Sequence, residues 1–544
     1  MTTPRAAIAA MVLPMALAAC GGGGDGPGDD SAVLYRGNTA EPFSLDPHQA
    51  SGVWENNIIS DMIIGLYQDD AAGEPIPGMA TGYEVSEDGL AWTFTLREAE
   101  WSDGVPVTAQ DFVFSMRRIL DPATIAQYAS LLYGIKNAEA VNKGQLAPEE
   151  LGVSAPDDRT LVIELEYPAP YLPSLLTHYT TYPVPAHVVE EYGSRWIQPE
   201  NAVFNGPYLL EEWRSNAFVH LVRNPNFYEA ETICFDEVYY YPTTDANAAV
   251  RRVRAGELDL NTSFPGQQVE ELEEQLPGFV HVYPYLNTVY YAPYMPEAPW
   301  DDVRVRRALS MSLDRQFMVD EILRTGQRPT STLVPPGIAN YEGVEQADWW
   351  DEDMDTRREE ARQLLMEAGF GPDNPLAFEF TYRNSGNNPR VAPVVQQNWE
   401  AIADWVQVSI SGIEVQIQYD NLRTGNFEVG DAGWVADYND AQNYLYLLES
   451  RTGSMNYGRY SNPEYDALIA ESNRELDPER RSNLLARAER MMLDDVAIIP
   501  MWNDTSRNLV DPEITGWEDN VSDKHRTRFL CRPGLEPGGP AAAE

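Results

Sequence analysis

The chain has 544 residues, more than a single hydrophobic core usually organises, so two or three domains are expected. Hydrophobic residues make up 43% of the chain, with 13 Trp and 29 Tyr, which excludes general disorder. Its 85 acidic and 38 basic residues give a formal charge of −47, and such a surface repels phosphate backbones, so nucleic acid is not an expected partner.

The first twenty residues read as an export signal. Arg5 precedes an apolar run over residues 6–19, which is too short to span a bilayer comfortably. The run ends in LAAC, which resembles the lipobox of bacterial lipoproteins, whose cysteine becomes the acylated first residue. We therefore predict a lipoprotein signal peptide over residues 1–20, lipidation at Cys20 and a flexible Gly/Asp tether over residues 21–32. The alternative is a plain secretory signal with an unrelated cysteine.

The next segments alternate between strand-like and helix-like patterns. Residues 92–97 alternate apolar and polar side chains, as a half-buried strand does. A turn at residues 102–104 follows, and Thr108 with Asp111 predicts the start of an amphipathic helix. This alternation favours interleaved α/β domains.

Further along, the pattern of alternating elements continues. Residues 238–242 and 282–286 are predicted strands rich in tyrosine. Thr356 and Glu359 predict a capping box, and Gly369 predicts the end of the helix that the box opens. No other segment approaches eighteen consecutive apolar residues, so we expect the mature body to be held at a membrane by its lipid alone.

Sequence signatures of catalysis are missing. No G-x-S-x-G elbow, phosphate-binding G-x-x-x-x-G-K-[ST] loop or H-E-x-x-H pair occurs, and none of the six histidines has another at i+3 or i+4. Residues 351–355 imitate the start of an EF-hand loop, but Thr356 replaces its glycine and Arg362 its bidentate glutamate. We therefore predict no enzymatic activity, no metal site and no cofactor.

Besides Cys20, the chain contains Cys234 and Cys531. Two thiols in an exported protein can form one disulfide, or they can stay buried and unpaired, and the sequence leaves both open. They are too few and too distant for a zinc cluster.

Several short stretches, taken together and in order, resemble the bacterial extracellular solute-binding proteins of family 5, the periplasmic oligopeptide-binding proteins of ABC transporters. These stretches are residues 44–48 (SLDPH), 92–97 (WTFTLR), 101–111 (WSDGVPVTAQD), 205–208 (NGPY), 223–228 (RNPNFY), 256–259 (GELD), 302–308 (DVRVRRA), 313–315 (LDR), 367–370 (EAGF) and 432–439 (AGWVADYN). Each is weak alone, but together they keep the family's order over most of the chain.

The resemblance implies an α/β fold, namely a periplasmic-binding-protein clamshell of type II with two lobes and an extra third α/β domain. The predicted parts are lobe I (residues 33–63, 186–286 and 502–535), the extra domain (64–185), lobe II (287–501) and a disordered tail (536–544). Strands that pass twice between the lobes would form the hinge.

The resemblance also implies a ligand site between the lobes. A protein that serves many peptides reads the backbone and the terminal amine that all peptides share, and reading a backbone requires strand-like edges. The family's ligand-flanking strand matches Gly433, Trp434 and Val435, and its opposite wall matches Ser51, Gly52 and Val53. Asp437 stands where the family anchors the peptide's α-amine. The aromatic positions of the cavity match Trp434, Tyr128, Tyr285 and Tyr290.

The chain departs from the family at the other end of the ligand. Members that grip the peptide's C-terminal carboxylate use an arginine where this chain has Asp431, and a histidine near Asn388. A carboxylate close to Asp431 would be disfavoured by the like charge. Arg390 and Arg423 are nearby candidates to replace the missing cation, so the reading of a free C-terminus stays open.

We therefore predict a monomeric substrate-binding lipoprotein of an ABC importer, lipid-anchored in the periplasm or at the outer envelope surface. It would capture short peptides by backbone hydrogen bonds and an ion pair from Asp437 to the α-amine, and deliver them to a permease and ATPase complex. One alternative is a protein of the same fold for a murein peptide, opine, oligosaccharide or metal chelate. Another is a secreted hydrolase.

Overall fold

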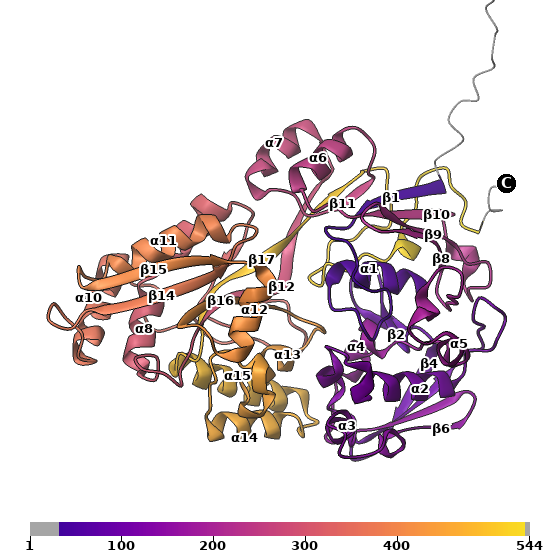
Figure 1. Ribbon diagram of the computed structural model, residues 1–544, viewed down its shortest axis with the longest axis horizontal. Coiled ribbons are helices and arrows are strands. Elements are labelled where there is room, and N and C mark those ends of the chain that lie inside the picture. The colour runs from indigo at the N-terminus through magenta and orange to yellow at the C-terminus, as the bar shows by residue number, and fades with distance from the viewer. Residues whose placement is uncertain (1–31, 539–544) are drawn as a thin grey trace, which may run out of the picture.

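The computed structural model describes residues 32–538, and one large mixed sheet runs through it (Figure 1). The strand order is β15-β14-β16-β12-β17-β11-β1-β10-β9-β8, with β13 paired to β17 outside this path. The two ends of the sheet lie in two separate bodies, and β12 (Val280–Pro293) and β17 (Ile499–Val510) run side by side between them. These two long antiparallel strands therefore connect the bodies in the manner expected of a hinge.

Lobe I, the extra domain and lobe II denote the ranges predicted from the sequence, and those boundaries stay a prediction. Lobe I contains β1 (Val33–Gly37), α1 (Val53–Met62), α5 (Ala186–Tyr192), β8 (Tyr208–Arg214), β9 (Phe218–Arg223), β10 (Glu237–Tyr241), α6 (Ala246–Arg254), β11 (Leu260–Thr262) and α7 (Val269–Gln275). The extra domain contains β2 (Tyr67–Asp69), β3 (Pro75–Pro77), β4 (Ala80–Val85), β5 (Ala91–Leu96), α2 (Ala109–Leu120), α3 (Ala138–Asn142), β6 (Val153–Asp157), β7 (Thr160–Glu164) and α4 (Leu172–Leu175). A four-stranded antiparallel sheet in the order β4-β5-β7-β6 forms its frame.

Lobe II holds the other end of the large sheet. Its elements are α8 (Val303–Met311), α9 (Arg315–Phe317), β13 (Arg328–Pro329), α10 (Met354–Glu367), β14 (Leu376–Arg383), α11 (Asn388–Glu400), β15 (Val406–Ile413), α12 (Val415–Thr424), β16 (Val429–Val435), α13 (Gln442–Leu445), α14 (Pro463–Ser472) and α15 (Pro478–Asp494). No helix between residues 32 and 538 combines the length and the apolar character needed to cross a bilayer.

The sheet of lobe II is buried on both faces. Val289 and Tyr291 belong to one hydrophobic cluster, with side chains of α8, α10 and α11, whereas Tyr290 and Ala292 belong to a second cluster, with side chains of α12 to α15. Successive residues of a strand point to opposite faces, so this alternation places one helical layer on each face. The apolar run in β12 follows from this double burial.

Two local predictions have different outcomes. The predicted helix start at Thr108 is confirmed, because the Thr108 amide donates to Asp111 Oδ2 at 2.8 Å ahead of α2. The predicted capping box of Thr356 and Glu359 is wrong, because Asp353 caps α10 instead and accepts from the Thr356 amide at 3.0 Å. Asp353 immediately precedes the helix and already accepts from the Asp355 and Thr356 amides of its first turn, so Thr356 lies inside the helix.

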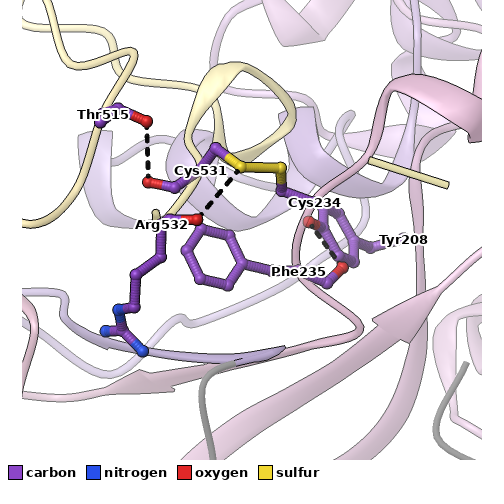
Figure 2. The surroundings of a disulfide bond; sticks show 6 residues. All are labelled: Tyr208, Cys234, Phe235, Thr515, Cys531 and Arg532. Carbon is purple, nitrogen blue, oxygen red and sulfur yellow. Dashed lines mark hydrogen bonds between the residues drawn. A yellow bond between two sulfur atoms is a disulfide. The ribbon is translucent and has the colours of Figure 1, made fainter. Parts of the chain in front are cut away.

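Cys234 and Cys531 form a disulfide with a Cα–Cα distance of 5.3 Å (Figure 2). The bond joins the segment before β10 to the C-terminal segment, 297 residues away in the sequence. Phe235 and Arg532 lie beside it. Of the two alternatives that the sequence leaves open, the structure has the disulfide. The predicted signal peptide and Cys20 lie outside the described residues.

Candidate ligand-binding site

The outer edge of β16 is open over its second half. On one side, β16 pairs with β12 along its whole length, with Gly433 opposite Val289 and Val435 opposite Asn287. On the other side, β14 pairs only with Val429 and Gly430. No strand in the described part of the chain pairs with that side of residues 431–435. An extended ligand can therefore add to the sheet through this edge.

The opposite wall, residues 51–53, differs from the extended edge that was expected. Ser51 and Gly52 precede α1, and buried Glu55 accepts hydrogen bonds from both of their amides, at 3.1 and 2.5 Å. A Cβ on Gly52 would fall 2.5 Å from the Trp54 ring, so the close approach at this glycine is to the chain's own tryptophan. The Ser51 and Gly52 amides already donate to the Glu55 side chain and are not available to a ligand backbone. The Val53 side chain is exposed.

Asp437 lies two residues beyond the end of β16, and its side chain is only 10% exposed. Its backbone amide donates to Asn443 Oδ1 at 3.0 Å, and the same oxygen accepts from Trp434 Nε1 at 2.9 Å, which fixes the loop. Asp437 Oδ2 is buried and has no hydrogen-bond partner among residues 32–538. Burial raises the pKa of this carboxyl to about 7. A buried carboxylate with a free oxygen favours a cationic partner.

The nearest basic side chain comes from the extra domain and is neutral. His178 Nε2 lies 3.8 Å from Asp437 Oδ1, but burial lowers the pKa of His178 to about 3. At neutral pH this imidazole therefore does not offset the charge of Asp437. His178 Nδ1 lies 2.8 Å from Thr180 Oγ1, and its ring centroid lies 5.6 Å from that of Tyr128.

Asp437 acts electrostatically on two of the three predicted cavity tyrosines. The pKa of Tyr128 is raised by burial and then by Asp437, and Asp437 also contributes, after burial and two other aspartates, to the raised pKa of Tyr285. Tyr290 is only 4% exposed and packs in a core cluster of lobe II. Trp434 belongs to the same cluster, although its indole N–H helps to fix the Asp437 loop.

The extra domain contacts lobe II beside Asp437. The rings of Tyr171 and Tyr438 stack at a centroid distance of 5.1 Å and an interplanar angle of 7°. Arg481 makes two hydrogen bonds to Asp440, at 2.7 and 2.8 Å, and its guanidinium lies 5.5 Å from the Tyr171 ring centroid. These contacts hold the extra domain against lobe II next to Asp437, whose side chain is only 10% exposed, and electrostatic interactions are stronger where water is scarce.

At the other end of the open edge, Asp431 is buried and paired. Its side chain accepts from Arg383 Nε and Nη2 at 2.8 and 3.1 Å and from Asn388 Nδ2 at 3.0 Å. Arg383 Nη1 also donates to Tyr419 Oη at 3.0 Å. The expected repulsion between Asp431 and a ligand carboxylate is therefore largely offset, because Arg383 neutralises the aspartate.

A pocket of about 240 Å³ lies beside this pair. Its lining includes Gly433 and Val435 from β16, together with Asn287, Gln327, Arg383, Asn388, Tyr419, Asp504 and Arg507. The two candidate arginines of the sequence lie outside the lining: Arg390 is exposed on α11, and Arg423 is exposed on α12, where it pairs with Asp420 at 3.3 Å. Sequence reasoning missed Arg383 and Arg507, since neither stands in a motif and both reach the pocket only through the pairing of distant strands.

No group of three or more His, Cys, Asp or Glu side chains between residues 32 and 538 is arranged to hold a metal ion. The arrangement is a binding site with a buried anion at one end, an open strand edge along its length and a polar pocket at the other end.

Comparison with known proteins identifies the family. The family described as bacterial extracellular solute-binding proteins, family 5 Middle, matches residues 74–456. The periplasmic oligopeptide-binding protein OppA of Salmonella typhimurium is 39% identical over 492 residues, which cover 90% of each chain.

Solved structures agree with this assignment. The complex of Haemophilus influenzae OppA with the peptide RPPGFSPFR aligns with a TM-score of 0.84 and 37% identity, over 93% of this chain and 99% of that one. The murein tripeptide binding protein MppA of Escherichia coli aligns with a TM-score of 0.83 and 36% identity, over 92% and 98% of the two chains. The predicted α/β clamshell of the periplasmic binding proteins is confirmed. The chain therefore belongs to the bacterial extracellular solute-binding proteins of family 5, which are transport binding proteins and not enzymes.

Proposed function

We propose that this protein captures short peptides for an ABC importer and hands them to the membrane permease and its ATPase. The observation that carries the proposal is the position of Asp437, a buried carboxylate with a free oxygen at the end of an open strand edge. A peptide offers a terminal ammonium to the carboxylate and a backbone to the edge. Its side chains need not be read.

The relatives support a peptide as the ligand. OppA of Salmonella typhimurium is named for oligopeptide binding, and MppA of Escherichia coli for murein tripeptide binding. A murein peptide is the second candidate ligand, since MppA is almost as similar to this chain as OppA is.

Calorimetric titration with alanine peptides of three to five residues tests the proposal. Free-amine peptides are expected to bind, whereas their N-acetylated forms and cello-oligosaccharides are not. Asp437→Ala leaves the ligand's ammonium unpaired in the shut site, which costs about 3–5 kcal/mol, or about a hundredfold or more in affinity. Asp420→Ala, on the surface of α12, is the matched control. Equal binding of free and acetylated peptides would contradict the proposal.

We also propose a location in the periplasm or at the outer envelope surface, with the protein held there by lipid on Cys20. The LAAC sequence and the Gly/Asp tether support this anchor. Metabolic labelling with radioactive palmitate is expected to mark the protein and to leave Cys20→Ser unlabelled. A soluble, unlabelled parent protein would refute the anchor and leave the binding function untouched.

A further inference from the structure

The pocket beside Gly433 is lined by an arginine whose guanidinium is unpaired within the described part of the chain. Arg507 is half-buried on β17, opposite Val282 of β12, and lines the pocket with Val435. Its guanidinium forms no ion pair and no hydrogen bond with any residue between 32 and 538. A partly buried arginine has lost part of its hydration, so a ligand anion placed here has little water to displace from it.

The other arginine of the pocket is not free in this way. Arg383 uses Nε and Nη2 for Asp431 and Nη1 for Tyr419. Its charge is offset by Asp431, and each of its three nitrogen atoms already donates a hydrogen bond. Arg507 therefore has the available positive charge.

Asp504 is the negative group of the same pocket. It accepts hydrogen bonds from Gln327 Nε2 at 3.0 Å, from the Thr505 amide at 2.9 Å and from Asn287 Nδ2 at 3.5 Å. These donors are neutral, so they supply no positive charge to offset Asp504. The pocket thus disfavours an anion near Asp504 and favours one at Arg507, so the position of the bound charge is specified.

The distance from the amine site suits a short peptide. β16 ends at Val435, two residues before Asp437, so a ligand that is anchored at Asp437 and runs along the open edge reaches the pocket-lining Val435 and Gly433 within a few residues, at about 3.3 Å per residue. Gly266 of lobe I lies beside the Arg507 guanidinium, where a Cβ would be 3.4 Å from Nη1. Gln267 Nε2 donates to Asn387 Oδ1 at 3.3 Å and joins lobe I to lobe II there. The two lobes therefore meet next to the pocket.

We propose that this pocket takes a carboxylate of the bound peptide and that Arg507 is the specificity-determining cation that holds it. The carboxylate can be the C-terminus of a peptide of about four residues or an acidic side chain near that position. This inference rests on the proposed function, because the peptide must first be anchored at Asp437.

The test compares peptide acids with peptide amides by calorimetric titration. Tri-, tetra- and penta-alanine are used as free acids and as C-terminal amides, with Ala-Ala-Ala-Glu-amide as a further probe. The unaltered protein is expected to bind the best acid about ten- to hundredfold more tightly than its amide, as for a charge-assisted hydrogen-bonded pair. If the glutamate-containing amide binds as tightly as the acid, an acidic side chain can supply the carboxylate; if it binds as weakly as tetra-alanine amide, the C-terminus supplies it.

Variants assign the effect to Arg507. In Arg507→Gln the acids are expected to bind as weakly as the amides, while amide binding stays unchanged. Arg507→Lys keeps the charge and is expected to retain part of the preference. Arg390→Gln and Arg423→Gln make the same charge change on exposed helical surfaces and are expected to behave like the parent.

Three results overturn the inference. They are equal binding of acids and amides by the unaltered protein, a preference for acids that survives in Arg507→Gln, and a preference lost equally in the Arg390 and Arg423 controls. The comparison on the unaltered protein needs no variant to fold. If no free-amine peptide binds at all, the proposed function fails together with the inference, whereas peptide binding without a preference for acids defeats the inference alone.

Discussion

The affinity for peptides is expected to depend steeply on pH, because the anchoring carboxylate titrates near neutrality. Burial raises the pKa of Asp437 from the ordinary 3.8 to about 7 in the protein without ligand. A bound ammonium requires this carboxyl to be ionised, so each binding event releases about half a proton at pH 7 and close to one proton at pH 6 and below. At pH 5 only about 1% of the carboxyl is ionised, and the apparent affinity is expected to be about a hundredfold weaker than its maximum.

The affinity is also expected to fall on the alkaline side. A peptide's α-amine loses its proton above about pH 8, so binding there requires the uptake of one proton. The maximum is therefore expected between about pH 7 and pH 8. His178 does not alter this window, because burial lowers its pKa to about 3 and it stays neutral throughout.

Calorimetry measures both the affinity and the proton release. Titrations at pH 6 in two buffers of different ionisation enthalpy give the number of protons released, and titrations between pH 5 and pH 8 give the slope. Asp437→Asn cannot titrate at this position, so it is expected to bind weakly with no slope below pH 7. A constant affinity of the unaltered protein from pH 5 to pH 7, without proton release, would refute the assignment of Asp437 as a buried, titrating anchor.

Three further predictions concern the stability of the fold. The pKa of Asp437 is raised in the ligand-free fold, so its contribution to stability is present at low pH and is expected to be lost as the pH rises from 3.8 to about 7. Asp437→Asn should therefore flatten the pH dependence of the free energy of unfolding in urea over that range. An unchanged slope in the variant would contradict this prediction. Arg383→Gln leaves Asp431 buried without its ion-pair partner, and we expect the free energy of unfolding in urea to fall by about 3–5 kcal/mol. The double variant Arg383→Gln with Asp431→Asn is expected to recover most of this loss. Additive losses of the two single variants would show that the two groups do not interact. Replacing Cys234 and Cys531 by Ala removes a long-range crosslink, and we expect the free energy of unfolding to fall by about 2–4 kcal/mol, as measured by thermal unfolding without reductant. Equal stability of the variant and the parent would mean that the bond does not constrain the unfolded chain.

The sequence predicts local structure where the signal itself is local. Thr108 and Asp111 lie three residues apart, and this spacing alone defines the capping box ahead of α2. At α10 the chain offers two good caps, Asp353 and Thr356, and composition does not rank them. Which of the two residues caps the helix depends on which backbone amides of its first turn lack a hydrogen-bond acceptor in the folded protein.

The two ends of the site differ in how far sequence could predict them. Asp437 was found because its neighbours match a family motif, although its burial and free oxygen were not visible in the sequence. Arg383 pairs with Asp431 only because β14 and β16 lie side by side, 48 residues apart along the chain. Arg507 reaches the pocket because β17 returns between the lobes. Contacts of this kind depend on strand order, which no local spacing encodes.

The aspartate at position 431 changes the electrostatics of the far end less than its charge suggests. A lone buried carboxylate there would oppose a ligand carboxylate, but the side chains of Arg383 and Asn388 donate three hydrogen bonds to Asp431, and the Arg383 guanidinium offsets its charge. Because the Arg383–Asp431 pair is neutral as a whole, the charges that act on a ligand in the pocket are those of Asp504 and Arg507. Because neutral donors surround Asp504, whereas the Arg507 guanidinium has no ion-pair or hydrogen-bond partner between residues 32 and 538, a ligand carboxylate gains most at Arg507. The charge that selects a ligand at this end is therefore displaced from β16 to the crossing strand β17.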